Sequence, residues 1–315
     1  MRSNKRSIVI GTYVRTTAID HLVYRFLESQ HGSGQKKQII SLGAGTDTRV
    51  FQLLSSRTPP PDVIYHEIDF PVNTAAKIRA IRSSSILQGA LGSTTRRADE
   101  VKISDTGDAL HSPCYHIHPL DLRSLAKRTP SPPSAAETTP LSPNQTPHLQ
   151  DVDPTLPTLL ISECCLIYLS PQEADDVVHY FTKTLFPPPK DTANSSTPLG
   201  LIIYEPIRPD DPFGRTMVSN LATRGIQLQT LNKYATLDAQ RTRLREYGFG
   251  RGQTAADVDF IWERWVSGEE KERVAGLEMV DEIEEWKLLA AHYCVAWGWR
   301  GDVFDCWRDI GGQLE

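Results

Sequence analysis

The sequence lacks any apolar run close to the ~20 residues that a membrane-spanning helix needs. Residues 1–10 contain basic residues, but the apolar stretch that follows them is too short for a signal peptide, so we expect none. The five cysteines are an odd number and include no C-x-x-C pair, so we expect neither a disulfide framework nor a cysteine zinc site. These absences favour the reducing cytoplasm as the location of the protein.

A surplus of basic residues is missing as well. Lys and Arg number 34 against 39 Asp and Glu, which gives a net charge of −5. Proteins that bind nucleic acid usually carry a basic excess on one face, so this balance argues against such a partner. The length of 315 residues allows one large domain or two small ones and is ample for a hydrophobic core.

Proline is abundant, and its 22 residues are clustered. Eight lie between Pro130 and Pro157 and four between Pro187 and Pro198. Because these stretches have little to bury, we expect disordered insertions at 129–157 and 187–198 within a single domain of residues 1–315. All six tryptophans lie in the last 54 residues, so the C-terminal part must pack on the rest of the fold.

Hydrophobic patterns alternate between strands and helices along the chain. Residues 19–27 follow the spacing of an amphipathic helix. Strands are predicted at 38–42, 63–69, 158–162 and 199–204, with a weaker one at 115–118. Helices are expected at 74–82, after Pro171 and over most of 211–289, with a closing strand or hairpin formed by 292–299 and the residues after Gly301. This alternation is typical of an α/β fold with a mostly parallel sheet, which binds ligands at the carboxyl ends of its strands.

The first such strand end carries Gly43-Ala-Gly45, whose glycines let the backbone approach a ligand closely. A dinucleotide-binding loop would need a third glycine where Thr48 stands, and Asp47 would disfavour a pyrophosphate. The loop therefore indicates a ligand other than a dinucleotide, or else a tight turn that binds nothing.

Acidic residues follow three other strands. Asp69 stands 26 positions after Gly43, where a carboxylate can accept both hydroxyls of a ribose, although a solvated carboxylate is the alternative. Asp121 and Glu163 occupy the next two strand ends. A charge where a buried strand meets a cleft needs a partner, either the ammonium group of a ligand or a protein Arg or Lys. Together these residues favour a nucleoside with a cationic tail, such as S-adenosylmethionine.

The motifs that carry these residues resemble those of the leucine carboxyl methyltransferase family. They are Gly11-Thr-Tyr-Val-Arg15, Leu42-Gly-Ala-Gly-Thr-Asp-Thr48, His66-Glu-Ile-Asp-Phe-Pro71, Leu120-Asp-Leu122, Glu163-Cys-Cys-Leu-Ile-Tyr168, Tyr204-Glu-Pro206, Asp211-Pro-Phe-Gly214 with Met217, and His292-Tyr-Cys294 with Trp297. The resemblance covers about residues 9–300 apart from the two insertions. It implies a Rossmann-like methyltransferase fold: a mostly parallel seven-stranded sheet, helices on both faces, and an added helical substrate-binding region.

The resemblance implies that six residues bind S-adenosylmethionine as the cofactor, Arg15 among them. Gly43 would lie against the cofactor, and Asp69 would hold its ribose. Asp121 and the backbone of Leu122 would read the adenine. Glu163 would contact the amino group of the methionine part.

Two residues, Arg15 and Tyr168, are implied as catalytic. Arg15 would hold the cofactor carboxylate and lie near the substrate carboxylate, while Tyr168 would orient the substrate terminus. The alternatives are a surface arginine at a helix end and a tyrosine of the hydrophobic core.

Members of the family methylate the C-terminal leucine carboxylate of the protein phosphatase 2A catalytic subunit. A peptide α-carboxylate has a pKa near 3.5, so it is ionised at pH 7 and needs no general base. We therefore expect no catalytic dyad and no metal site, and we interpret His66, His116 and His118 as strand or solvent residues.

The resemblance thus implies a carboxyl methyltransferase, expected to be monomeric, whose partner is the phosphatase tail rather than nucleic acid or membrane. One alternative is a relative of the tRNA wybutosine methyltransferases, which usually add a C-terminal β-propeller. Another is a non-catalytic module that binds cofactor or phosphatase. Only 14 residues precede Arg15, so we expect most of the family's N-terminal covering segment to be missing, with Lys5 or Arg6 as candidates to replace its lysine.

Overall fold

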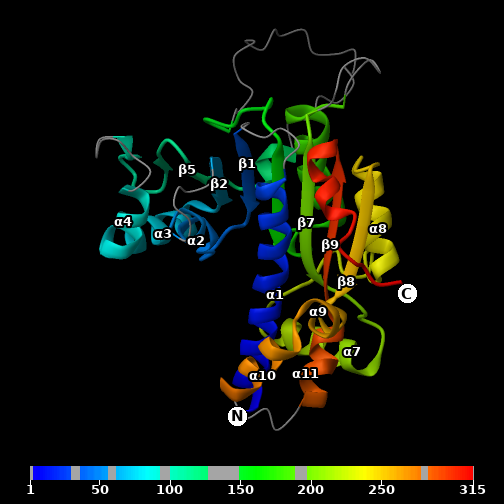
Figure 1. Cartoon of the computed structure of the whole chain (residues 1–315). Coiled ribbons are helices and arrows are strands. Elements are labelled where there is room, and N and C mark those ends of the chain that lie inside the picture. Colours follow the sequence, from blue (N-terminus) through cyan, green and yellow to red (C-terminus); the bar gives the residue numbers. More distant parts are fainter. Residues whose placement is uncertain are drawn as a thin grey trace. The chain divides into compact units, whose positions relative to one another are not determined.

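A computed structural model describes residues 3–29, 36–55, 62–92, 100–126, 149–188, 197–277 and 283–314 (Figure 1). The chain divides into two compact units. The first, called the α1 unit, comprises Met1–Ser33, Leu159–Pro171 and Pro198–Glu315. The second, called the β1 unit, comprises Gly34–Thr158 and Gln172–Thr197.

Five strands of the β1 unit lie in the order β3-β4-β5-β2-β1. Their bounds are β1 Lys37–Leu42, β2 Val63–Asp69, β3 Lys102–Ile103, β4 Leu110–His111 and β5 Tyr115–Pro119. β1 pairs with β2, and β2 with β5, in parallel, whereas β3, β4 and β5 pair antiparallel. The helices are α2 Arg49–Ser55, α3 Pro71–Ser83, α4 Ser85–Gly92, α5 Arg123–Ala126, α6 Pro171–His179 and the π-helix η3 Tyr180–Leu185.

The predicted strands at 38–42, 63–69 and 115–118 are confirmed as β1, β2 and β5. The helix predicted at 74–82 is α3, which begins earlier because Pro71 suits the first turn of a helix. The short β3–β4 hairpin was not predicted, since two-residue strands carry no readable alternation. Residues 129–148 and 189–196 of the two predicted insertions lie outside the described residues.

The strands of the α1 unit lie in the order β6-β7-β9-β8. Their bounds are β6 Thr158–Glu163, β7 Leu199–Pro206, β8 Gly252–Asp257 and β9 Tyr293–Arg300, with β9 antiparallel to both β7 and β8. The helices are α1 Ser3–Glu28, α7 Pro212–Thr223, α8 Leu237–Glu246, α9 Val258–Trp265, α10 Gly268–Leu277 and α11 Ile283–Ala291. Two 3₁₀ helices are η2 Leu166–Tyr168 and η4 Asp302–Trp307.

The α/β class is confirmed, but the described residues form nine strands of mixed direction rather than seven mostly parallel ones. The helical prediction for 211–289 was wrong at β8, whose small side chains in Gly252-Gln-Thr-Ala-Ala-Asp257 give no apolar run. The predicted closing strand is confirmed as β9. It forms no hairpin with the residues after Gly301, because that glycine (φ 85°) turns the chain into η4.

Helix α1 contains the predicted helix at 19–27 and forms the core of its unit together with the chain's C-terminal part. The ring of Phe26 stacks on Phe304 with 4.5 Å between ring centroids, and the indole nitrogen of Trp307 donates to the Leu22 carbonyl at 2.9 Å. Helices α9, α10 and α11 gather along the N-terminal half of α1 (Figure 1). The expectation that the tryptophan-rich segment packs on the fold is confirmed, since Trp297 and Trp307 are fully buried.

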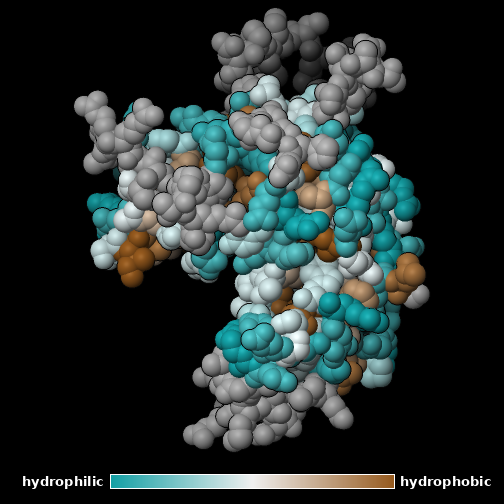
Figure 2. All heavy atoms as spheres, in the orientation of Figure 1, coloured by the Kyte–Doolittle hydropathy of each residue, from teal (hydrophilic) through white to brown (hydrophobic). Residues whose placement is uncertain are grey.

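The surface in view is mostly hydrophilic, with small and separate hydrophobic patches (Figure 2). Two of these patches lie at α4 and near the C-terminus, where Ile86 and Leu314 are exposed. None of the helices in the described ranges is long and apolar enough to cross a membrane.

Candidate functional site

The β1 unit places the glycine loop beside the acidic end of β2. Gly43 (φ 64°) and Gly45 (φ 50°) both adopt the left-handed conformation that favours glycine. The Asp69 carboxylate accepts hydrogen bonds from the backbone N–H of Gly45 at 2.7 Å and of Phe70 at 2.7 Å, and from the Asn73 amide at 2.8 Å. A carboxylate has about four acceptor positions, so Asp69 can still accept from a ligand hydroxyl.

The end of β5 supplies the other two residues predicted for the adenine. The backbone N–H of Leu120 donates to the Asp69 carbonyl at 2.8 Å, which keeps these two strand ends together. Asp121 pairs with the guanidinium of Arg123 at 2.7 Å, and Leu122 is buried. Arg123 in turn lies 6.0 Å from the ring centroid of Phe70.

Phe70 was given no role by the sequence reasoning, although it lies in one of the quoted motifs. Its side chain is 45% exposed, which is unusual for a large apolar residue next to a buried strand. A flat exposed ring beside Asp69 can stack on a nucleobase. Its place directly after the ribose-binding candidate was the signal that could have identified it.

A buried ion pair is hydrogen-bonded to the backbone directly after the glycine loop. The Lys77 ammonium lies 2.5 Å from the Glu67 carboxylate and donates to the Asp47 carbonyl at 2.6 Å. Both side chains of the pair are almost fully buried. Burial raises the pKa of Glu67 to about 7, while the neighbouring Lys77 opposes this shift.

We expect Glu67 to make the β1 unit less stable as pH rises from about 5 to 8. Because the folded-state pKa is raised, its stabilising contribution is complete below the unfolded value near 4.5 and is lost as pH passes about 7. Glu67→Gln should flatten this part of the profile, measured by urea unfolding across that pH range. Asp62→Asn, at an exposed position of the same unit, should keep the wild-type slope. A Glu67→Gln profile parallel to the wild type would contradict the assignment.

The α1 unit brings Arg15 and Glu163 together. Arg15 lies in the middle of α1, so the alternative of a surface arginine at a helix end was wrong. Its Nε atom lies 2.7 Å from Oε1 of Glu163 at the end of β6, so this carboxylate has a protein arginine as its partner. Both side chains stay partly exposed, which leaves the pair open to a ligand that carries an ammonium and a carboxylate.

Tyr168 follows the same strand, in η2, and its side chain is 43% exposed. The alternative of a core tyrosine was therefore wrong. Its backbone carbonyl accepts a hydrogen bond from the Gln229 amide at 2.6 Å. Partial burial raises the pKa of the Tyr168 phenol, so the hydroxyl stays protonated at neutral pH and can donate.

A cavity of about 500 Å³ opens beside Arg15. The guanidinium carbon of Arg15 lies 5.5 Å from the Tyr204 ring centroid, and that ring stacks on Tyr293 at 5.4 Å. Apolar side chains from three helices form much of the remaining lining, among them Phe213 and Met217 of α7, Val258 of α9, and Trp286 and Leu289 of α11. The sequence motifs included several of these residues but gave no reason to place them around one cavity.

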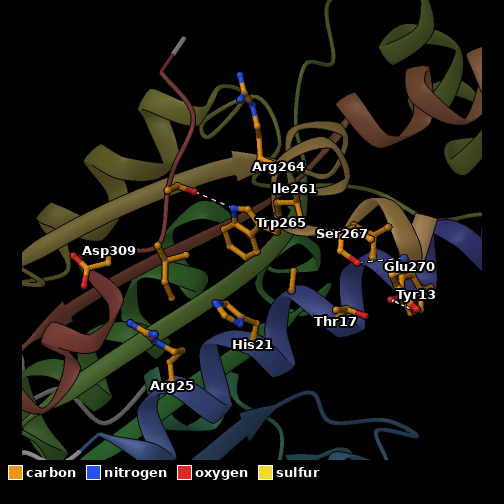
Figure 3. Close-up of a pocket in the computed structure, with 15 residues that line it drawn as sticks. Tyr13, Thr17, His21, Arg25, Ile261, Arg264, Trp265, Ser267, Glu270 and Asp309 are labelled. Atoms are coloured by element: carbon orange, nitrogen blue, oxygen red, sulfur yellow. Dashed lines mark hydrogen bonds between the residues drawn. The ribbon is translucent and has the colours of Figure 1, made fainter. Parts of the chain in front are cut away.

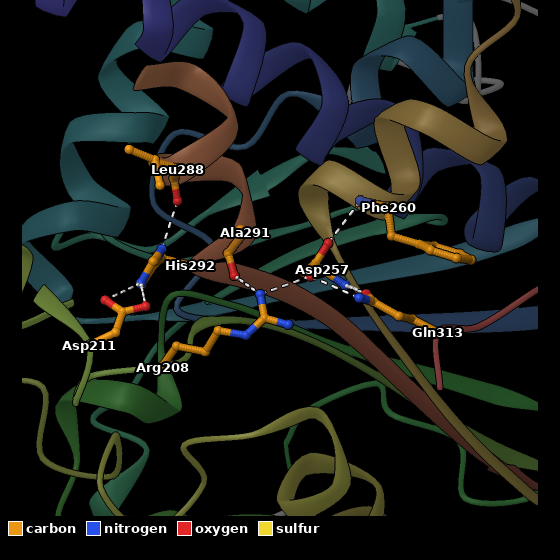
Figure 4. A network of polar contacts seen from close by, with 8 residues as sticks. All are labelled: Arg208, Asp211, Asp257, Phe260, Leu288, Ala291, His292 and Gln313. Carbon is orange, nitrogen blue, oxygen red and sulfur yellow. Dashed lines mark hydrogen bonds and ion pairs between the residues drawn. The ribbon is translucent and has the colours of Figure 1, made fainter. Parts of the chain in front are cut away.

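A polar network fixes α7, α9 and α11, three of the helices that line this cavity (Figure 4). Asp257 caps α9, pairs with Arg208 at 2.9 Å and bonds the Gln313 amide at 3.1 Å. Arg208 also donates to the carbonyl of Ala291 at the end of α11 at 2.6 Å. Asp211 caps α7 and pairs with His292 at 2.9 Å. The cavity walls are therefore held by charged groups outside the cavity itself.

The close packing around Gly214 explains why the Asp211-Pro-Phe-Gly214 motif ends in glycine. Its backbone N–H donates to the Asp211 carboxylate at 2.7 Å. A Cβ at this position would lie 2.0 Å from the backbone carbonyl oxygen of Arg208, so only glycine fits. The close approach lets α7 begin directly against the chain that precedes it.

A second cavity, of about 550 Å³, lies along another face of α1 (Figure 3). Tyr13, Thr17 and His21 recur every four residues and face Trp265 and Glu270. The Tyr13 hydroxyl donates to Glu270 at 2.5 Å. None of the residues predicted for cofactor or substrate lines this cavity, so we take the cavity at Arg15 as the candidate site.

Comparison with known proteins points to one group. Residues 1–119 match the family described as leucine carboxyl methyltransferase. The chain is 66% identical over 319 residues to the Aspergillus fumigatus protein named leucine carboxyl methyltransferase 1, covering 96% of this chain and 76% of that relative. It is 38% identical over 305 residues to the Schizosaccharomyces pombe protein of the same name, covering 96% and 84%.

The fold is similar to that of a solved structure from Thermobifida fusca, described as a possible methyltransferase. The TM-score is 0.51 at 13% sequence identity, over 95% of this chain and 83% of that one. At this identity the likeness supports the methyltransferase fold.

Proposed function

Because the chain belongs to the leucine carboxyl methyltransferase family and is therefore a methyltransferase, we propose that it methylates the C-terminal leucine α-carboxylate of a protein. We propose S-adenosylmethionine as the methyl donor and the catalytic subunit of protein phosphatase 2A as the substrate, with a methyl ester as the product. In this proposal the enzyme acts in the cytoplasm as a monomer.

The observation that carries the proposal is the cavity of about 500 Å³ beside Arg15. A C-terminal leucine presents a carboxylate and a branched aliphatic side chain on the same residue. The planar guanidinium of Arg15 can bind two carboxylate oxygens, and the apolar side chains around it can bury the leucine.

The residues also fit the proposed donor. In the β1 unit, the left-handed loop at Gly43 and the carboxylate of Asp69 suit the adenosine part, and Phe70 and Asp121 suit its base. In the α1 unit, the Glu163–Arg15 pair offers opposite charges to the ammonium and carboxylate of the amino-acid part. When bound, S-adenosylmethionine supplies an electrophilic methyl group on its sulfonium.

The chain's own contribution is positioning. The leucine carboxylate is already ionised at pH 7, so no residue has to remove a proton. Arg15 would orient this carboxylate, and the protonated Tyr168 hydroxyl can donate to one of its oxygens. The apolar walls would exclude water from the two opposite charges that neutralise each other as the methyl group moves. Alignment of this kind can supply about 7–11 kcal/mol.

We expect the wild-type chain to transfer label from methyl-labelled S-adenosylmethionine to intact phosphatase catalytic subunit. It should transfer none to a form that lacks only the final leucine, because the cavity would have no side chain or correctly placed carboxylate to bind. Base-labile release of the label checks that the product is an ester. Equal labelling of both phosphatase forms would refute the proposed substrate.

The same assay separates the alternatives. Binding of S-adenosylmethionine seen by calorimetry, without labelling of the intact phosphatase, would favour a non-catalytic module. Labelling of tRNA instead of the phosphatase would favour the tRNA methyltransferase alternative.

A further inference from the structure

Three polar side chains of the β1 unit meet at one point that the proposed methyl transfer does not use. His111 ends β4 and His116 lies in β5, and the antiparallel register places them directly opposite each other. Opposed residues on paired strands share one face of the sheet, which brings the two imidazoles together. Asp151, 40 residues beyond His111, brings its carboxylate to the same point.

The donor atoms have the spacing of ligands around one ion. Nδ1 of His111 lies 3.3 Å from Nδ1 of His116. Oδ2 of Asp151 lies 3.1 Å from the first nitrogen and 3.3 Å from the second. Donors about 2.1 Å from a common ion are roughly 3.4 Å apart in tetrahedral geometry and about 3.0 Å apart as octahedral neighbours.

The histidines are held in place by further rings. His66, His116 and His118 were interpreted as strand or solvent residues; they lie on β2 and β5 and are buried. The ring of His116 stacks on His66 with 4.8 Å between centroids, and Nδ1 of His66 lies 3.1 Å from Nε2 of His118. This packing fixes the direction in which the His116 ring presents Nδ1.

We propose that His111, His116 and Asp151 bind a divalent transition-metal ion, and that Zn²⁺ suits them best. Two imidazoles with one carboxylate favour zinc and its neighbours in the first transition series, whereas Mg²⁺ and Ca²⁺ prefer oxygen donors. A surface cavity of about 610 Å³, lined also by Glu100 and Lys102, gives access for the ion. The positive charge of Lys102 repels a cation, so the affinity of the site depends on the two imidazoles and the Asp151 carboxylate.

The position of the site assigns it a structural role. His116 lies near the start of β5, whereas Asp121 follows the end of that strand. An ion at His116 would tie the chain at Asp151 to the β4–β5 hairpin without touching the residues proposed for the methyl donor. We therefore expect bound zinc to stabilise the fold and leave the rate of methyl transfer unchanged.

The test measures Zn²⁺ binding to the full chain by competition with a chromogenic chelator. The wild type should bind one ion per chain. His111→Ala and Asp151→Asn should each weaken binding by at least roughly tenfold, since even residues behind the ligands cost 10–100-fold. Asparagine tolerates the left-handed backbone of Asp151 (φ 63°), so this variant should fold normally. Asp105→Asn, at an exposed position of the same unit, is the matched control and should bind as the wild type does.

A second readout is thermal unfolding with and without Zn²⁺. The ion should raise the melting temperature of the wild type and of Asp105→Asn but not that of the two site variants. Wild-type zinc affinity in both site variants would overturn the proposal, as would a wild-type chain that binds no zinc.

Discussion

Arg15→Ala should lower kcat/KM for methylation of the phosphatase tail by about thirty-fold to several thousand-fold. Removing one partner of a hydrogen-bonded charge pair costs about 2–5 kcal/mol, and each 1.36 kcal/mol is a factor of ten in rate. Arg15 pairs with Glu163 and lines the cavity proposed for leucine, so its loss affects both the donor and the acceptor. Steady-state kinetics with labelled S-adenosylmethionine measures the effect.

Two further variants separate this role from a general effect of charge. Arg15→Lys keeps the charge but loses the planar fork, so it should recover only part of the activity. Arg224→Ala removes another arginine of the same cavity, one that is exposed, and should have a much smaller effect. Circular dichroism checks that each variant is folded. Wild-type kinetics for Arg15→Ala would refute the role given to Arg15.

Arg243→Met should lower the free energy of unfolding by about 3–5 kcal/mol, because it leaves a buried carboxylate unpaired. Arg243 and Glu205 are both fully buried and lie 2.8 Å apart. The guanidinium also donates to the Tyr247 hydroxyl at 2.9 Å and lies 4.0 Å from the Tyr234 ring centroid. Urea unfolding of wild type and variant gives the difference.

The double variant Arg243→Met with Glu205→Leu tests the cause. Replacing a whole buried ion pair by apolar residues is often neutral or stabilising, so the double variant should recover most of the loss. Arg245→Met, at an exposed position of the same helix α8, should stay close to the wild type. A double variant as unstable as Arg243→Met alone would show that the unpaired Glu205 is not the cause.

Much of the β1 unit could be predicted from the sequence, because its signals are local. The strands before Gly43 and up to Asp69 are rich in Val, Ile, Leu and Tyr and end in residues of distinct chemistry. Burial on both faces of a parallel strand favours such residues, so these two strands can be recognised from the sequence. The pairing of Gly45 with Asp69 then follows from the common edge at which parallel strands end.

The cavity at Arg15 could not be predicted in the same way. Its lining comes from α1, α7, α9 and α11, which are brought together by long-range contacts such as Arg208 with Asp257. Hydrophobic periodicity predicts which face of a helix is buried, but not which other helix packs against that face. The histidine cluster was missed for the same reason: His111 belongs to a two-residue strand, and Asp151 reaches it from far along the chain.

The order in which the chain is synthesised has a consequence for the α1 unit, which is made of three separate segments. Helix α1 is synthesised before the other segments of its unit, yet the carbonyl of Leu22 accepts a hydrogen bond from Trp307, 285 residues later, and Arg25 donates to the carbonyl of Cys306. The β1 unit, by contrast, is complete in sequence by Thr197. During translation α1 therefore lacks these packing partners until the segment around Trp307 has been synthesised, whereas all segments of the β1 unit are available earlier.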